Sequence, residues 1–127
     1  MDWILDEYGE VSFEYIEELE QEKCRLKAEI EQGNIEAGRL LGDLYLNTFA
    51  SDSADDERAV YWYAKAAEGG DKEACVRLGD IYSHNKPTVT DKRFPSSIAA
   101  DLNKAYKYYQ KAEYHKGLER VRKMLKD

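Results

Sequence analysis

Cysteine, proline and glycine are all scarce in this sequence, and each shortage excludes a class of protein. The 127 residues include two cysteines, two prolines and eight glycines. So few prolines and glycines exclude a collagen-like chain and argue against long disordered stretches. Cys24 and Cys75 lie far apart, and two thiols can neither hold a zinc ion by themselves nor form a disulfide framework. We therefore expect two free thiols in a reducing compartment.

Long hydrophobic runs are also missing. No apolar stretch approaches the ~20 residues that a membrane-spanning helix needs. The chain begins with the acidic segment Met1–Glu7, which lacks the basic start and the apolar core of a secretory signal peptide. These absences predict a cytoplasmic protein that does not enter the membrane.

The motifs of common enzymes and metal sites are absent. The chain has no phosphate-binding glycine-rich loop, no His-Glu-x-x-His and no Gly-x-Ser-x-Gly. His84 and His115 are far apart, and neither has a carboxylate at a ligand spacing. The acidic run at residues 52–57 lacks the glycine and the final glutamate of a calcium loop, so a helix start explains it better. We predict no catalysis, no metal and no cofactor.

Positive charge is scarce in the first part of the chain. The formal net charge is −7, and residues 1–36 contain twelve acidic and three basic side chains. Such a surface argues against nucleic acid, because binding phosphates requires clustered lysine and arginine. Two interpretations remain open, an ordinary solvated helix face and a surface that attracts a basic protein.

What the sequence does contain is a pattern written twice. Shifting the chain by 37 positions superposes a first block of small and apolar residues, which pairs Gly33 with Gly70, Ala37 with Ala74, Leu41-Gly42-Asp43 with Leu78-Gly79-Asp80, and Tyr45 with Tyr82. A shift of 46 superposes a second block, which pairs Ala59 with Ala105, Trp62-Tyr63 with Tyr108-Tyr109, and Lys65-Ala66 with Lys111-Ala112. The difference between the shifts places an insertion in residues 83–100.

Both blocks have the 3–4 residue spacing of helices. We predict six helices, at Ser12–Gln32, Ile35–Asn47, Ala54–Glu68, Lys72–Ser83, Asp101–Tyr114 and Lys116–Lys126, and a short turn at Asp2–Glu7. A glycine inside a helix costs about 1 kcal/mol relative to alanine. Its recurrence at Gly42 and Gly79 therefore predicts that two helices approach closely there. Asn34 and Asp71, each after a glycine, are predicted to cap the helices that follow.

These residues resemble the Sel1-like repeat, a relative of the tetratricopeptide repeat. In that pattern an Ala-x-x-x-Leu-Gly-x-x-Tyr helix pairs with an Ala-x-x-Trp/Tyr-Tyr-x-x-Ala-Ala helix, and the resemblance covers Gly33–Ala112. It implies an all-α fold, a short right-handed α-α superhelix of about two and a half hairpins in one domain. We expect a capping segment at 1–32, repeats at 33–70 and 71–116, the second with a long loop at 83–100, and a terminal helix at 117–127. Some secreted members pair a cysteine at the Cys75 position with one eight residues earlier, but Ala67 stands there.

The resemblance implies a non-catalytic adaptor that binds a partner protein or peptide through its concave face. The residues that would face the partner are those of the first helix in each hairpin, namely Glu36, Arg39, Asp43, Asn47, Glu73, Val76, Asp80 and His84. They are also explained as ordinary solvated residues, or, for the repeated Asp43 and Asp80, by a helix-stabilising role. Residues 83–100 and the acidic first helix are the other candidate contact surfaces.

A second hypothesis suits the small size and acidity of the chain, an immunity-type inhibitor that neutralises a bacterial toxin, such as a basic one, by direct binding. A third, a beta-lactam-binding or hydrolysing enzyme, rests only on relatives of the family, since no nucleophile with an adjacent base is recognisable. We favour the adaptor, and a monomer.

Overall fold

The computed structural model describes residues 13–47, 53–84 and 98–126, and all regular structure in these ranges is helical. There are six helices in the described ranges: α1 (Phe13–Glu31), α2 (Ile35–Asn47), α3 (Ser53–Glu68), α4 (Lys72–Tyr82), α5 (Leu102–Ala112) and α6 (His115–Lys126). All six predicted helices are confirmed, with ends that differ by at most two residues. The turn predicted at Asp2–Glu7, and most of the loop at 83–100, lie outside the described residues.

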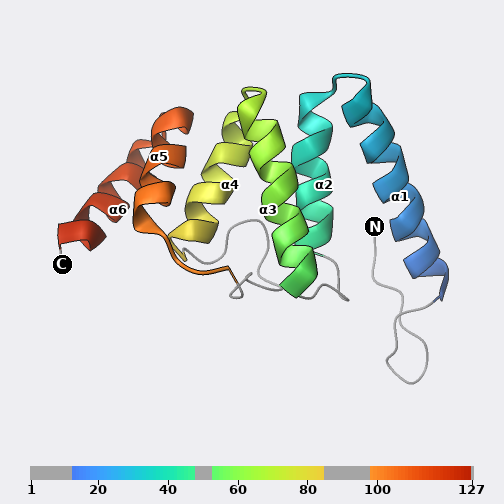
Figure 1. The fold of residues 1–127 in the computed structure, drawn as a ribbon, viewed down its shortest axis with the longest axis horizontal. Helices are drawn as coiled ribbons and strands as arrows, with labels where there is room; N and C mark the ends of the chain where they lie inside the picture. The colour runs from blue at the N-terminus through green and yellow to red at the C-terminus, as the bar shows by residue number, and fades with distance from the viewer. Residues whose placement is uncertain (1–12, 48–52, 85–97, 127) are drawn as a thin grey trace.

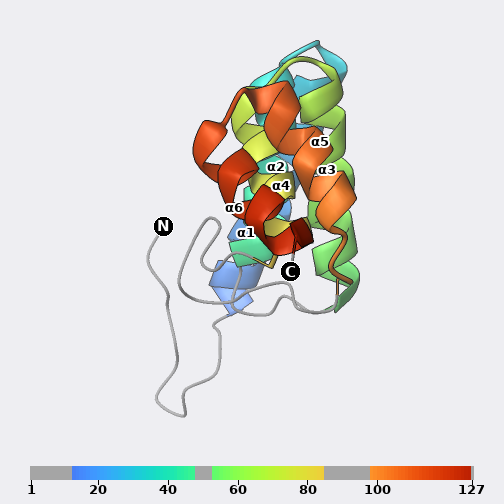
Figure 2. The same ribbon diagram turned by 90° about the vertical axis from the view of Figure 1, so that its left-hand side faces the viewer.

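The helices form a stack in chain order, from α1 at one end to α6 at the other (Figure 1). Each helix packs against its successor, and the contacts within the pairs α2–α3 and α4–α5 are the most extensive. Seen along the stack from the α6 end, α3 and α5 lie on one side, and α2, α4 and α6 on the other (Figure 2). The predicted all-α stack of successive hairpins is therefore confirmed.

Side-chain caps and glycines define where the helices begin and end. The Asp71 carboxylate accepts a hydrogen bond from the Ala74 backbone N–H, 3.0 Å away, and Asn34 does the same for Ala37 at 3.4 Å. Gly33 and Gly70, which precede these caps, have φ angles of +94° and +104°. Residues with a Cβ rarely adopt this conformation, so glycine is needed at both turns. Both predicted caps are confirmed.

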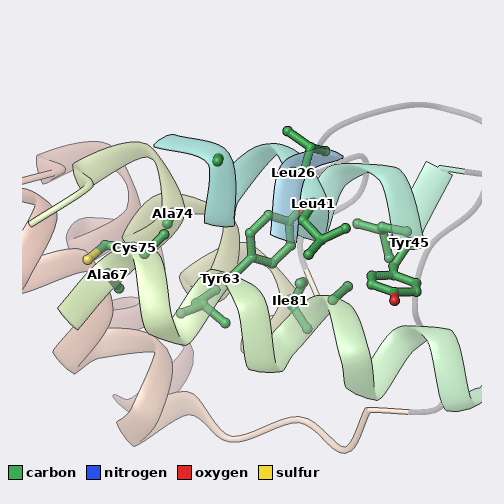
Figure 3. Close-up of a cluster of buried hydrophobic side chains, with 13 residues drawn as sticks. Leu26, Leu41, Tyr45, Tyr63, Ala67, Ala74, Cys75 and Ile81 are labelled. Atoms are coloured by element: carbon green, nitrogen blue, oxygen red, sulfur yellow. The ribbon is translucent and has the colours of Figure 1, made fainter. Parts of the chain in front are cut away.

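The core lies between neighbouring helices. Its main cluster spans α1 to α4 and includes Leu26, Leu41, Tyr63 and Ile81 (Figure 3). A second, smaller cluster lies between α5 and α6 and contains Ala105, Tyr109 and Val121. The repeated alanines at 37, 59, 74 and 105, the leucines at 41 and 78 and the tyrosines at 63 and 109 are buried, because the same small and large side chains fill the same contact in each hairpin.

The repeated glycines allow a tyrosine ring to pack directly on a helix backbone. A Cβ atom at Gly42 would lie 2.7 Å from the Tyr63 ring, and one at Gly79 would lie 2.5 Å from the Tyr109 ring. Both distances are shorter than a carbon–carbon contact allows. The close approach predicted at these two glycines is confirmed.

Candidate protein-binding face

The predicted contact residues follow one side of two parallel helices. Glu36, Asp43 and Asn47 lie on α2, Glu73, Val76 and Asp80 lie on α4, and His84 follows α4. Their spacing of three or four residues places them on one side of each helix, next to the side on which Gly42 and Gly79 lie. We call this surface, formed by α2 and α4, the α2–α4 face.

The two repeated aspartates on this face accept hydrogen bonds from the two repeated tyrosines. The Tyr63 hydroxyl donates to Asp43, and the Tyr109 hydroxyl donates to Asp80, which is only 8% exposed. Each tyrosine ring crosses its glycine, and its hydroxyl reaches the acid that follows that glycine in the sequence. The aspartates therefore recur because they hold the second helix of each hairpin on the first.

Burial changes the acidity of these groups. Burial raises the pKa of Asp43, against the opposing effects of the Tyr63 hydrogen bond and the Arg77 charge. Burial, with the hydrogen bond to Asp80, raises the pKa of Tyr109 to about 12, and the pKa of Tyr63 is raised well above its ordinary value for similar reasons. Both tyrosines are therefore neutral hydrogen-bond donors over the physiological pH range.

An arginine joins each bonded pair of aspartate and tyrosine. It comes from the helix that follows the hairpin, which is α4 for the first pair and α6 for the second. Arg77 Nε on α4 lies 2.8 Å from Asp43 Oδ1, but its N–H is not aligned for a hydrogen bond, so the attraction is one of charge. Arg120 Nη2 on α6 donates to the Tyr109 hydroxyl at 2.8 Å. We call Asp43–Tyr63–Arg77 and Asp80–Tyr109–Arg120 the two Asp–Tyr–Arg triads. Each joins three helices: the two of one hairpin and the first helix of the next.

These two arginines were not predicted from the sequence, although a signal was present. A shift of 43 positions superposes α4 on α6 and pairs Ala74 with Gly117, Arg77 with Arg120, and Leu78 with Val121. The Tyr109 ring packs on Gly117 about as closely as on Gly79, since a Cβ atom added at Gly117 would lie 2.6 Å from the ring. By this superposition α6 occupies the position of a first helix.

Arg39 links the same two helices at the other end of the face. Its Nε lies 3.1 Å from the Asp71 carboxylate that caps α4, and its Nη2 lies 3.1 Å from Glu36. The side chains of Arg39 and Asp71 are largely buried. Arg39 and the Asp43–Tyr63–Arg77 triad thus connect α2 to α4, and little of their polar surface is left for a partner.

The accessible part of the α2–α4 face is acidic and apolar. The side chains of Glu36 and Glu73 are 64% and 66% exposed, although each forms an ion pair with an arginine of its own helix. Leu40, between Glu36 and Asp43 in the helical register of α2, is 40% exposed, and Val76 on α4 is half-buried. Leu40 was not among the predicted contact residues. Its signal is the mismatch between an apolar residue and a position on the polar side of the helix.

The other predicted residues are placed differently. His84 is exposed, and its Nε2 lies 2.8 Å from the Ile98 carbonyl, which joins the two described ends of the 83–100 loop. The Asp101 N–H donates to the Tyr82 carbonyl, 2.8 Å away, and holds the same ends together. The side chain of Asn47 lies outside the described residues.

The acidic charge of the first helix is partly neutralised within the helix. Arg25 forms ion pairs with Glu22 and with Glu29, and Lys23 lies 3.2 Å from Glu20. Such exposed pairs contribute little to stability, because water and salt screen their charges. They nevertheless reduce the charge that α1 offers to a partner.

The two cysteines lie on different helices, α1 and α4. Cys24 is exposed and Cys75 buried, both are free thiols, and burial raises the pKa of Cys75, which disfavours the reactive thiolate. Within residues 13–47, 53–84 and 98–126, no three histidine, cysteine or acidic side chains gather into a possible metal site. Over the same residues, no helix combines the length and the hydropathy that crossing a bilayer requires.

Comparison with known proteins gives one match. A family model of the Sel1 repeat matches residues 36–71 and 95–119. The first match contains α2, α3 and the cap of α4, and the second contains α5 and the beginning of α6. The matches thus fall on helices that form the triads, and α4 lies between them. No curated protein and no solved structure matches the chain.

Proposed function

Since the chain is a Sel1-like repeat protein, and Sel1 repeats generally mediate protein–protein interaction, we propose that it is a non-catalytic adaptor whose α2–α4 face binds a partner protein. In this proposal the first helices of the hairpins line the concave side of the stack, as in tetratricopeptide proteins. The observation that carries the proposal is the exposed Leu40, one helical turn after the accessible Glu36 on α2, together with a second accessible carboxylate, that of Glu73, on α4.

The chemistry of this surface favours a partner with a basic and apolar segment. An exposed leucine gains about 25 cal/mol per Å² of apolar surface when a partner covers it. Each glutamate pairs with only one arginine, so its carboxylate can accept further hydrogen bonds from lysine or arginine. The Asp43–Tyr63–Arg77 triad and Arg39 hold α2 and α4 at a defined spacing, so this surface is preorganised and loses little entropy on binding. Of the eight predicted residues, Glu36, Glu73 and Val76 are the ones that we propose as direct contacts.

The test compares two double charge reversals of equal size. The Glu36→Lys/Glu73→Lys variant changes the proposed contact, whereas Glu57→Lys/Glu68→Lys changes two exposed acids of α3. Partners captured by the wild-type protein are identified by mass spectrometry, and their affinity is measured by calorimetry. We expect the first variant to lose at least about tenfold in affinity, or roughly 1.4 kcal/mol, and the second to bind as the wild type does.

Equal binding by both variants would remove the α2–α4 face from consideration. The 83–100 loop and α1 would then be the remaining contact surfaces. Circular dichroism spectra of both variants show whether each keeps its helices, which separates lost binding from lost folding.

An immunity-type inhibitor is the second form of the same proposal. The accessible carboxylates on α2 and α4 suit a basic toxin as well as they suit a basic segment of an assembly. Stoichiometry separates the two: one partner bound one to one with nanomolar affinity supports the inhibitor, and several weaker partners support the adaptor. The two free thiols fit a reducing compartment such as the cytoplasm in both cases.

A further inference from the structure

Each end of the helical stack is half of a hairpin. The 37-residue shift that superposes Gly33 on Gly70 also superposes α1 on α3, so α1 has the position of a second helix. The 43-residue shift gives α6 the position of a first helix. Among the described elements, α1 packs mainly against α2, and α6 packs against α5 and α4. The hairpin partners of α1 and α6 are therefore not among these six helices.

The open side of α6 has apolar residues where the equivalent side of α4 is covered. Ile81 is fully buried and Tyr82 half-buried in α4. Their counterparts in α6 are Met124 and Leu125, which are 39% and 47% exposed. The counterpart of Gly79, on which the Tyr109 ring of the second helix packs, is Arg122, which is exposed and donates to the Tyr106 hydroxyl of α5.

The side of α1 that would face a preceding helix differs from the equivalent side of α3 in its size and charge. Leu26 replaces the bulky ring of Tyr63, but it is 2% exposed and belongs to the main core cluster, so it offers no surface to a partner. Glu22 and Glu29 replace Ala59 and Ala66, the two small residues that contact the facing helix in the first hairpin. Compared with α4, α6 therefore has a larger and positively charged side chain at this contact. Compared with α3, α1 has negatively charged side chains there.

The net charges of the two helices agree with these substitutions. Between Phe13 and Glu31, α1 contains seven acidic and three basic residues, whereas α6 contains one acidic and five basic residues. Opposite net charges on two surfaces of related shape favour their association.

We propose that α6 of one copy of this chain packs against α1 of a second copy, in the arrangement that the two helices of a hairpin have. Arg122 then lies opposite Glu22 and Glu29, and Met124 and Leu125 are covered. The two surfaces are different, so the contact is head-to-tail and leads to open chains of copies rather than a closed dimer. It is weak and driven by charge, and the protein is a monomer in dilute solution.

The first measurement is the dependence of mass on salt. At about 0.01 M ionic strength, where charges act over ~30 Å, sedimentation equilibrium should give a weight-average mass that rises with concentration above the 14.7 kDa of one chain. At about 1 M, where the screening length is ~3 Å, association should weaken by more than tenfold.

The decisive measurement uses two charge-reversal variants, Arg122→Glu and Glu22→Arg. Each alone places like charges opposite each other and should associate at least tenfold more weakly than the wild type. In an equal mixture every mixed contact again joins opposite charges, so association should return to within threefold of the wild type. Lys107→Glu, the same reversal on an exposed position of α5, should have no effect. If Glu22→Arg does not fold, as judged by circular dichroism, Glu29→Arg takes its place.

Three results would overturn the proposal. One is a wild-type protein that stays at the mass of one chain at millimolar concentration and low salt. Another is a mixture of the two reversals that associates no better than either variant alone. The third is a Lys107→Glu variant that associates as weakly as Arg122→Glu, since that would indicate an effect of net charge only.

Discussion

Tyr109 shows how much a single side chain contributes to this fold. Its ring fills the space left by Gly79 and Gly117, and its hydroxyl donates to Asp80 and accepts from Arg120. The side chain is fully buried and contacts α4, α5 and α6. The hydroxyl can donate to Asp80 only in its neutral state, so folding is linked to pH.

The sign of that linkage follows from the raised pKa of Tyr109. The unfolded tyrosine ionises near its ordinary pKa of 10.0, while the folded one holds its proton until about 12. The stabilisation is therefore complete below pH 10 and is lost as the pH rises from about 10 to about 12. We expect urea unfolding of the wild type to show a steep loss of stability in this window.

The Tyr109→Phe variant tests this assignment. It should be less stable at neutral pH by about 1–3 kcal/mol, because Asp80 loses a buried donor. Its stability should fall less steeply between pH 10 and 12 than that of the wild type. Tyr61→Phe, at a side chain that is 53% exposed, is the control. A Tyr109→Phe slope equal to that of the wild type would contradict the linkage.

Pairs of helices approach each other most closely where the first helix has a glycine. Two glycines of the first-type helices differ in what a methyl group would meet. At Gly79 an added Cβ would lie 2.5 Å from the Tyr109 ring, whereas at Gly38 its nearest contacts would be ordinary ones of 3.4 Å, to Ala66 and to the Trp62 carbonyl. The two positions are thus a matched pair for measuring the value of close packing between elements.

Gly79→Ala and Gly38→Ala should have effects of opposite sign. Alanine favours a helix over glycine by about 1 kcal/mol at either position. At Gly79 the overlap with Tyr109 forces the helices apart, and overpacking of this kind costs about 1–3 kcal/mol or more. We expect Gly79→Ala to lower the unfolding temperature and Gly38→Ala to leave it unchanged or raise it. Similar effects at both sites in thermal unfolding would refute the packing argument.

The described residues form two apolar clusters that polar contacts link. The larger cluster extends from α1 to α4, and the smaller one holds α5 and α6 together. Arg120 links the end of the stack to its centre, since it donates to Tyr109 on α5 and to Ser83 at the end of α4. Helices in such a stack contact mainly their neighbours, so the hydrogen bonds of Arg120 determine whether local unfolding of α6 spreads to α5 and α4.

Replacing Arg120 should therefore destabilise one end of the molecule. Arg120→Met keeps an apolar stem but removes a charged donor, whose hydrogen bonds are worth about 1.5–3 kcal/mol. We expect amide hydrogen exchange in α6 to accelerate by at least about tenfold, while α2 and α3 exchange at the wild-type rate. Equal acceleration in all six helices would instead indicate a single cooperative unit.

Much of the local structure was predictable from residues close together in the sequence. The periodic apolar positions and the glycine–cap pairs at Gly33-Asn34 and Gly70-Asp71 predicted all six helices and their ends. The reason is that helix spacing, caps and left-handed turns depend on neighbouring residues. The Leu-Gly-Asp repeats likewise predicted where helices would meet, because a glycine inside a helix has a local cost that needs a tertiary explanation.

The roles of the polar residues on the α2–α4 face were less predictable. Asp43 and Asp80 share a helical register with Glu36 and Glu73, and from the sequence all four were equally good contact residues. The difference arises from Tyr63 and Tyr109, which lie 20 and 29 residues further along the chain. Whether these rings reach the aspartates depends on the spacing between packed helices, which periodicity does not specify.

The sequence by itself thus determined the all-helical stack, its turns and its repeated small-residue contacts, because each of these depends on local periodicity and on repetition. Only the tertiary structure decided which acids are bound to tyrosine and arginine and which remain accessible. Hydrogen bonding and burial at these positions involve side chains from three different helices, and their relative placement exists only once the helices have packed.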